Sequence, residues 1–401
     1  MTPRAQTILL LSLLIAIGFV AQKYARVISR LFGLKGESLV GIEFILIGML
    51  LGPHGLNLIT SEAFDGLFPI FSLALGWIGL TMMIEMDFRT VTRIPFRLAG
   101  ISLLASLITL GVVYSLFSAL LPDFASKLNW ALILGLLAIP VAPEMIASQM
   151  RNFKHKSKDL HQVLTLGILD DFHSILMYSI LFPFLVHAYT GMDFLRLLLL
   201  GLLVGGICGV ILNLLTIPSR KRSELLLILI GTVFLASGLS GMLNISPLFT
   251  NATCGVVVAN SSFKRLRMAD VLQKAERPVF FFFLLLVGLL LDLEALYQSK
   301  MVWAGLIIAC LFILFRFIGK FVGYWLSTQF NGPVLAATEL TFIGQSGIFI
   351  AILVDLRLAI AGPESNELLF TGILAFILNS LLLHLVIRYK IKKIQHENIR
   401  F

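Results

Sequence analysis

The stretch that decides the fold is VLTLGILDDFHSILMYSILF, residues 163–182, which places Asp170 and Asp171 side by side in apolar sequence. About seven mostly apolar residues precede the pair and about ten follow it. An ionised carboxylate at the centre of a bilayer costs roughly 2.5–3.5 kcal/mol on insertion scales. An intramembrane acid therefore indicates a functional site, most often a proton or ion relay. The alternative, a helix boundary that leaves the pair in water, fits poorly with the apolar residues on both sides.

The composition indicates an integral membrane protein. Hydrophobic residues make up 58% of the 401-residue chain and charged residues only 13%, whereas soluble domains carry about 25% charged residues. The seven His residues show no metal-binding spacing, and no Gly-rich phosphate loop is present, so an enzyme is not expected. Neither a disulfide nor a cofactor is expected, because no CxxC spacing joins the cysteines, Cys208, Cys254 and Cys310.

The expected fold is an all-α polytopic membrane protein with about thirteen transmembrane helices. About 20 apolar residues cross the hydrocarbon core, and short or Pro- and Gly-interrupted segments leave twelve or fourteen spans open. The predicted spans are residues 7–29, 38–58, 66–86, 97–121, 129–150, 161–187, 194–217, 223–242, 245–262, 277–292, 301–328, 332–355 and 367–388.

The positive charges predict the orientation of these spans. With loops numbered from zero at the N-terminal end, 24 of the 31 Lys and Arg residues fall in odd-numbered loops and 5 in even-numbered ones, while Arg316 and Lys320 lie in a span. Cytoplasmic loops carry the excess of Lys and Arg. The N-terminus is therefore expected outside an inner or plasma membrane and the C-terminus in the cytoplasm. The formal charge of +9 is then a topology signal and does not indicate nucleic-acid binding.

A weak internal repeat pairs spans that lie seven apart. Ile78–Phe88 resembles Val287–Ala295, and Gly167–Leu169 resembles Gly372–Leu374. An odd offset reverses the orientation, so two inverted-topology repeats of six spans are expected, with one site at the midplane between them. The whole chain, 1–401, then forms a single transmembrane domain with repeat one at about 7–187, a linker helix at 194–217, repeat two at about 223–388, and a short basic cytoplasmic tail at 389–401.

Spans five and twelve contain residues that interrupt helices. Span five holds Pro140 and Pro143, which remove two backbone donors, followed by Glu144; span twelve holds Glu339 and a Gly- and Ser-rich patch. Unwound backbone at membrane depth persists only where protein or water satisfies it. We therefore expect two crossed, discontinuous helices beside Asp171. The alternative is an ordinary proline kink with each Glu near an interface.

Span eleven carries two cations on one helix face, because Arg316 and Lys320 are four residues apart. Long basic side chains often reach an interface instead, but Lys320 lies moderately deep. A lysine that faces the bundle interior needs a carboxylate partner, and we expect Asp170 to pair with Lys320. Arg316 is the alternative cation for Asp170. Nearby His173 either tunes a pH response or is neutral and donates to a carbonyl.

These residues together resemble the monovalent cation/proton antiporters, which include sodium/proton antiporters and Kef-type potassium efflux systems. The likeness covers nearly the whole chain. The double Asp matches the paired acid of the electrogenic branch, and Lys320 matches the membrane lysine of that branch. Looser likenesses to the second span, the third span and the crossing helix of the family run through Ser38–Gly55, Gly76–Asp87 and Ala138–Met145.

The chain also departs from the family pattern in places that concern ion identity and regulation more than the fold. Pro143-Glu144 stands where the crossing helix usually has Thr-Asp. The Gly-Gly-Glu-Phe of Kef-type proteins reads Ala337–Leu340 here, and their Gln-Asp pair is Asp-Asp.

The resemblance implies exchange by alternating access, in which the crossed helices and span six move against a scaffold of outer spans. Asp171 would bind either the cation or a proton, so the two compete for one charge. Hard alkali ions prefer oxygen ligands. Besides a transient alkali-ion site on Asp171, the candidate ligands are nearby carbonyls, water and the side chains of Thr165 and Ser174, with Glu144 as a supporting group.

Three rival functions stay open at this point. A Kef-type gated potassium pathway fits the same fold, and a sodium-coupled organic-anion symporter would use the basic residues of span eleven. A non-transporting scaffold or sensor would show no ion flux. The expected partners are Na⁺, K⁺ or Li⁺, protons, the lipid bilayer and a second copy of the chain in a homodimer.

The charge bias makes a testable prediction about topology. Single cysteines introduced at Lys154 and Lys300, in a background without the three native cysteines, should react with a membrane-impermeant reagent from opposite faces. Reaction of both from the same face would contradict the thirteen-span arrangement and the inverted repeat with it.

Overall fold

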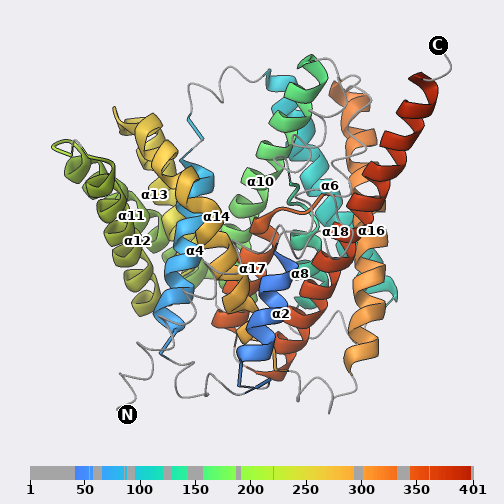
Figure 1. Ribbon diagram of the computed structural model, residues 1–401, viewed down its shortest axis with the longest axis horizontal. Helices are drawn as coiled ribbons and strands as arrows, with labels where there is room; N and C mark the ends of the chain where they lie inside the picture. The colour runs from blue at the N-terminus through green and yellow to red at the C-terminus, as the bar shows by residue number, and fades with distance from the viewer. Residues whose placement is uncertain are drawn as a thin grey trace.

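The computed structural model describes residues 41–53, 55–56, 66–84, 86–87, 95–120, 129–142, 157–186, 191–219, 221–292, 301–331, 344–360 and 362–398. All regular elements in this part of the chain are helices (Figure 1). They are α2 (Ile42–Leu51), α4 (Phe68–Met83), α6 (Phe96–Leu120), α8 (Trp130–Leu137), α10 (Ser157–Val186), α11 (Gly191–Thr216), α12 (Arg222–Leu243), α13 (Pro247–Ser261), α14 (Arg265–Leu289), α16 (Met301–Asn331), α17 (Gly347–Ala359) and α18 (Pro363–Asn398).

Apolar sequence accounts for most of these helices. Six stretches are long and apolar enough to cross a membrane, and they lie in α6, α10, α11, α12, α16 and α18. The helices α2 and α4 and the second part of α14 are apolar but shorter. The expectation of an all-α membrane protein is confirmed. The first predicted span, 7–29, lies outside the described residues, as do Pro143, Glu144 and Glu339.

Two helices extend beyond the predicted spans. The apolar part of α14, Pro278–Leu289, agrees with the predicted span 277–292, but the helix already begins at Arg265 and continues through Pro278. The first turns of α14 precede its apolar stretch and are charged. Asp270 in these turns pairs with Arg222 and Lys274. The basic tail that was expected from residue 389 is also largely helical, since α18 runs to Asn398.

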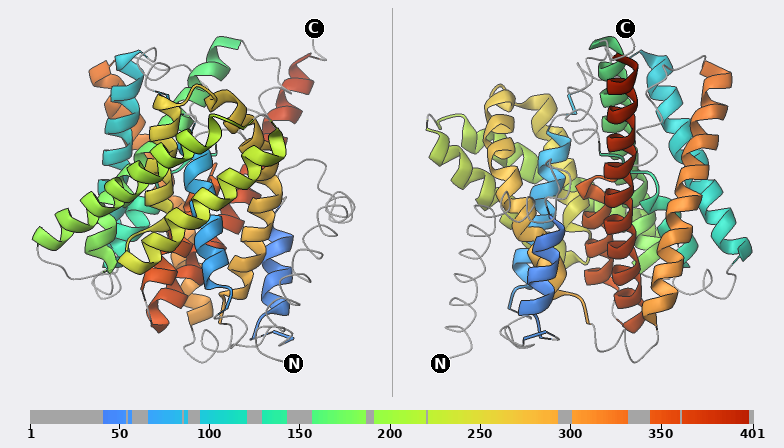
Figure 2. Two further views of the ribbon diagram at one scale, coloured as in Figure 1. Left: turned by 90° about the vertical axis from the view of Figure 1, so that its left-hand side faces the viewer. Right: turned by 45° about the vertical axis from the view of Figure 1, so that its right-hand side comes forward.

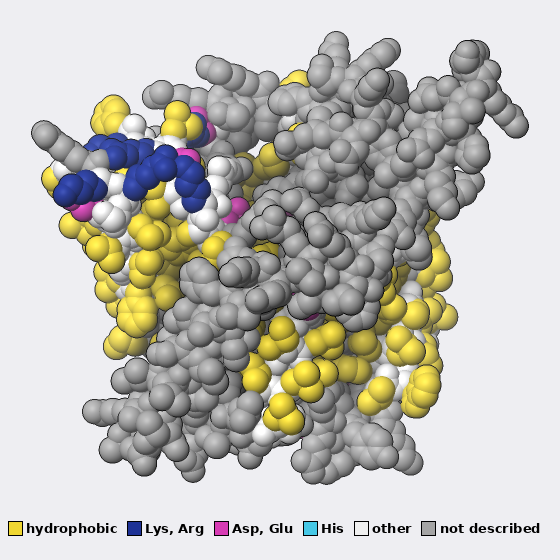
Figure 3. Space-filling model, in the orientation of Figure 1, with side chains coloured by type: hydrophobic (Ala, Val, Ile, Leu, Met, Phe, Trp, Pro, Cys, Tyr) yellow, Lys and Arg dark blue, Asp and Glu magenta, His cyan; other side chains and the backbone are white. Residues whose placement is uncertain are grey.

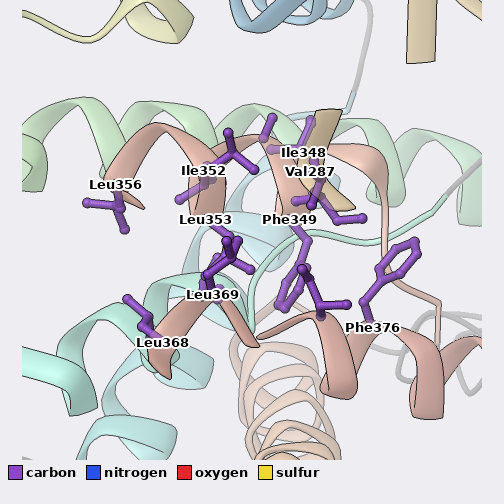
Figure 4. Packing of buried hydrophobic residues seen from close by; sticks show 14 of the residues in the cluster. Val287, Ile348, Phe349, Ile352, Leu353, Leu356, Leu368, Leu369 and Phe376 are labelled. Atoms are coloured by element: carbon purple, nitrogen blue, oxygen red, sulfur yellow. The ribbon is translucent and has the colours of Figure 1, made fainter. Parts of the chain in front are cut away.

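The helices form two bundles, and helices of different bundles approach each other's backbone less extensively than helices within one bundle do (Figure 2). The site bundle consists of α6, α8, α10, α16, α17 and α18, and the flanking bundle of α2, α4, α11, α12, α13 and α14. The apolar core between them is continuous. Figure 4 shows part of it, with residues of α17 and α18 and with Val287 of α14.

Glycines allow two helices of the flanking bundle to approach backbone to backbone. A Cβ atom built on Gly48 of α2 would lie 2.0 Å from the carbonyl oxygen of Leu285. A Cβ atom on Gly288 of α14 would lie 2.1 Å from the carbonyl oxygen of Ile45. Small residues at such contacts are typical of helix pairs in membranes, where close van der Waals packing drives association.

Replacing Gly48 with Ala should lower the stability by about 1–3 kcal/mol, because an extra methyl group in a packed interface forces the backbone to shift. The measurement is the melting temperature of the purified protein in detergent. Gly231→Ala in α12 is the matched control, since a Cβ atom there meets nothing within 4 Å and Ala is the better helix former. Equal melting temperatures for Gly48→Ala and the unsubstituted protein would contradict the close approach of α2 and α14.

Candidate functional site

The carboxylate of Asp170 lies in the middle of α10 and is held by four side chains from two other helices. Lys320 Nζ lies 2.6 Å from Oδ2 of Asp170, and Tyr324 donates its hydroxyl to the same oxygen at 2.8 Å. Ser102 donates to Oδ1 at 2.7 Å, and Ser106 donates to it at 3.5 Å. The side chains of Asp170 and Lys320 are both 0% exposed. This acid is therefore paired and fully removed from water.

Helical spacing explains how the partners of Asp170 come together. The two residues from α16 are four apart, as are the two serines from α6, so each pair lies on one face of its helix. The two helices approach closely at Gly323, where a Cβ atom would lie 2.7 Å from the carbonyl oxygen of Ala105. Close packing of α6 and α16 thus directs both polar faces at one carboxylate.

Asp171 has a different environment from its neighbour. Its Oδ1 accepts a hydrogen bond from the backbone N–H of Val141 at 3.0 Å and another from the hydroxyl of Ser346 at 3.0 Å. Its side chain is buried, with 6% of the residue exposed. Within the described part of the chain, Asp171 forms no ion pair. Among the described residues, the Asp171 carboxylate therefore accepts hydrogen bonds but has no Lys or Arg side chain paired with it.

Arg316 joins the two non-helical stretches that flank this site. The chain leaves α8 and continues without helical structure to Ala142, and it enters α17 from an extended stretch that begins at Gly344. Arg316 Nε donates to the carbonyl of Ala138 at 3.1 Å, and its Nη2 donates to the carbonyls of Pro140 at 2.9 Å and Gly344 at 2.5 Å. One buried guanidinium thus donates hydrogen bonds to backbone carbonyls of both non-helical stretches.

The structure decides which cation pairs with Asp170. Lys320 forms the expected ion pair, whereas Arg316 is directed to backbone carbonyls. Pro140 lies after the end of α8, and its carbonyl accepts a hydrogen bond from Arg316. His173 is buried, and its Nδ1 lies 3.1 Å from the hydroxyl of Ser102.

The two hydroxyl residues that were expected to bind the ion from within α10 are placed less favourably. Ser174 lies on the same side as Asp171, but it donates to the backbone carbonyl of Asp171 at 2.8 Å. Thr165 is half-buried and lies six residues before Asp171. Six residues turn an α-helix by about 600°, so Thr165 projects from a different face.

Sequence reasoning missed Ser102, Ser106, Tyr324, Ser346 and the N–H of Val141. The two serines at i and i+4 in apolar span four were a usable signal, as was Tyr324 one turn after Lys320. Among the described residues, no group of three or more His, Cys, Asp or Glu side chains is placed to hold a metal ion. A cation at this site would instead meet one carboxylate together with hydroxyl and carbonyl oxygens.

Comparisons with known proteins agree with this architecture. The family model described as "Sodium/hydrogen exchanger, transmembrane" matches residues 39–388. The structure resembles that of the sodium/proton antiporter MjNhaP1 from Methanocaldococcus jannaschii at pH 8, with a TM-score of 0.72, 15% identity and coverage of 96% of this chain and 100% of that one.

An electron-microscopy map of the same antiporter gives a TM-score of 0.61 at 16% identity, with 94% of each chain covered. At such identities the likeness shows the fold alone. A search of curated proteins found no match. The family match spans most of the chain and concerns membrane transporters, not enzymes. The chain therefore belongs to the transmembrane sodium/hydrogen exchanger family.

Proposed function

We propose that this protein exchanges a monovalent cation, Na⁺ or K⁺, for protons by alternating access, and that Asp171 binds either the cation or a proton. One observation carries the proposal: of two adjacent buried acids, Asp170 is paired with Lys320, whereas Asp171 has two hydrogen-bond donors and no ion pair among the residues that the structure describes. A buried carboxylate without a fixed cation needs a mobile positive charge or a proton, since an isolated charge in an apolar medium is very costly.

Coupling follows from competition for the Asp171 carboxylate. A proton and a cation neutralise the same charge, so the binding of one excludes the other. Alkali ions prefer oxygen ligands, and the hydroxyl of Ser346 is placed 3.0 Å from Oδ1 of Asp171. When a cation binds, this hydroxyl can turn its oxygen toward it. Lys320 pairs with Asp170, which leaves Asp171 to alternate between the two ligands.

The movement that we propose displaces the site bundle relative to the flanking bundle. The less extensive backbone approach between the bundles favours this boundary. Arg316 supports it as well, because its bonds to the carbonyls of Pro140 and Gly344 tie both interruptions into one body. The thirteen spans, the inverted repeats and the crossed discontinuous helices of the family resemblance are part of the same proposal.

The proposed orientation places the N-terminus outside and the C-terminus in the cytoplasm. Basic residues gather where α12 and α14 begin, and this end lies on the same side as the C-terminal end of α18 (Figures 1 and 3). Arg222, Lys264, Arg265 and Lys274 all lie at this basic end. A cytoplasmic position for it follows from the excess of Lys and Arg on that side of membrane proteins.

Asp171→Asn should abolish cation-dependent proton flux, because the amide has no charge to exchange. The protein should still fold, since the amide oxygen can accept from both Val141 and Ser346. The measurement is proton flux into sealed vesicles after addition of NaCl, KCl or LiCl, one salt at a time. Asp270→Asn, at the basic end, is the control and should exchange like the unsubstituted protein. Robust exchange by Asp171→Asn would overturn the assignment.

The same vesicles test the rival transport functions. A gated potassium pathway would pass K⁺ without a fixed ratio of protons, and an anion symporter would need an organic anion. Exchange with a constant cation-to-proton ratio supports the proposal against both.

Lys320→Met should destabilise the protein by about 3–5 kcal/mol, because it leaves Asp170 buried without its cation. Adding Asp170→Asn should restore part of the loss. The measurement is a double-mutant cycle of stability in detergent at neutral pH. The matched control is the exposed pair Lys274–Asp270, for which Lys274→Met should cost at most about 1 kcal/mol. Additive effects at Lys320 and Asp170 would mean that the two charges do not interact.

A further inference from the structure

A third buried acid, Asp355, lies in α17 and is not part of the proposed ion-binding site. It is 2% exposed. Its Oδ2 accepts a hydrogen bond from the hydroxyl of Tyr178 at 2.7 Å and a second, very short one from the hydroxyl of Ser246. No ion pair to Asp355 is found among the residues that the structure describes.

The two donors come from different bundles. Tyr178 belongs to α10, so its bond to Asp355 lies within the site bundle. Ser246 is the N-cap residue of α13, so its bond to Asp355 runs from the flanking bundle to the site bundle. Both α10 and α17 contact α13. The contact is therefore a buried polar link across the boundary at which the proposed movement takes place.

A second polar link crosses the same boundary. The side-chain amide of Asn366 in α18 accepts from the N–H of Asp292 at 3.2 Å and donates to its carbonyl at 3.2 Å. Asp292 follows α14, and Ser246 follows α12. Because α12 and α14 both begin at the basic end, the two links lie at the opposite end of the molecule.

We propose that Asp355 is a positioning residue for exchange: its bond to Ser246 holds the site bundle against α13 and keeps the end of the pathway opposite the basic end closed. This inference rests on the proposed alternating-access function. The bond must break when the bundles separate at that end, so it favours the arrangement described here. Its acceptor oxygen matters for this role, and its charge does not.

Loss of the bond changes the balance between the two arrangements. A typical intramolecular hydrogen bond changes an equilibrium by about two- to tenfold. An apparent affinity scales with the fraction of protein in the competent arrangement. Without the bond, the apparent KM for a cation added on the side of the membrane nearer Ser246 should fall. The apparent KM for a cation added on the side of the basic end should rise. Simple structural damage would lower the maximal rate or change both KM values in one direction.

The test compares right-side-out and inside-out vesicles that contain Asp355→Ala. We expect the ratio of the two KM values to change by about two- to tenfold. Asp355→Asn should restore it, because the amide keeps an acceptor oxygen. Tyr178→Phe is the matched control, since it removes the bond within the site bundle and should leave the ratio near its original value. An unchanged ratio in Asp355→Ala, or a change in Asp355→Asn as large as in Asp355→Ala, would overturn the proposal.

A second variant and a second readout make the test independent of folding and of transport. Ser246 also caps α13 by accepting from the N–H of Phe249 at 3.0 Å, and Gly at an N-cap costs only a few tenths of a kcal/mol. Ser246→Gly should reproduce the KM ratio of Asp355→Ala, and the double variant should add nothing. Either variant should also speed hydrogen exchange at the start of α13. If the unsubstituted protein moves no ions, the proposed transport function is wrong. Amide hydrogen exchange tests the Asp355–Ser246 bond independently of transport: unaltered amide exchange at the start of α13 in the variants would overturn the proposed link.

Discussion

Neutralising the charge of Asp170 in a medium that cannot solvate it is the constraint on which the centre of this protein depends. The carboxylate is 0% exposed, and Lys320, a tyrosine and two serines surround it. Such a pair does not by itself add much net stability, because both charges lose their hydration, but breaking it is costly. The pair and the two serines therefore fix α6, α10 and α16 relative to one another, and among the described residues the adjacent Asp171 has no ion pair.

Two non-helical stretches, residues 138–142 after α8 and 344–346 before α17, supply the described hydrogen-bond partners of Asp171. The stretch after α8 offers the N–H of Val141, and the stretch before α17 offers the hydroxyl of Ser346. Both stretches also release carbonyls that would be costly to bury unpaired. Arg316 satisfies three of them. A planar, permanently charged guanidinium suits this task, because it presents several donors in a fixed fork.

Much of this architecture could be predicted from the sequence. Apolar length placed α6, α11 and α12 to within a few residues, and the depth of Lys320 indicated its pairing with Asp170. The start of α14 could not be predicted, because charged residues continue a helix beyond the bilayer without any break in propensity. The partners of Arg316 are backbone atoms, which leave no mark in residue types. Ser174 was misleading, since a serine in a membrane helix can satisfy itself on the carbonyl of an earlier residue.

The hydrogen bonds of Arg316 to both non-helical stretches have a consequence for ion selectivity. A single side chain binds the carbonyls of Ala138, Pro140 and Gly344, so neither stretch can shift without pulling on the other. In the proposed exchange, the two groups that these stretches place at Asp171, the N–H of Val141 and the hydroxyl of Ser346, would then keep one arrangement in both states of the transporter. A cation arriving from either side of the membrane would therefore be selected by the same arrangement of groups.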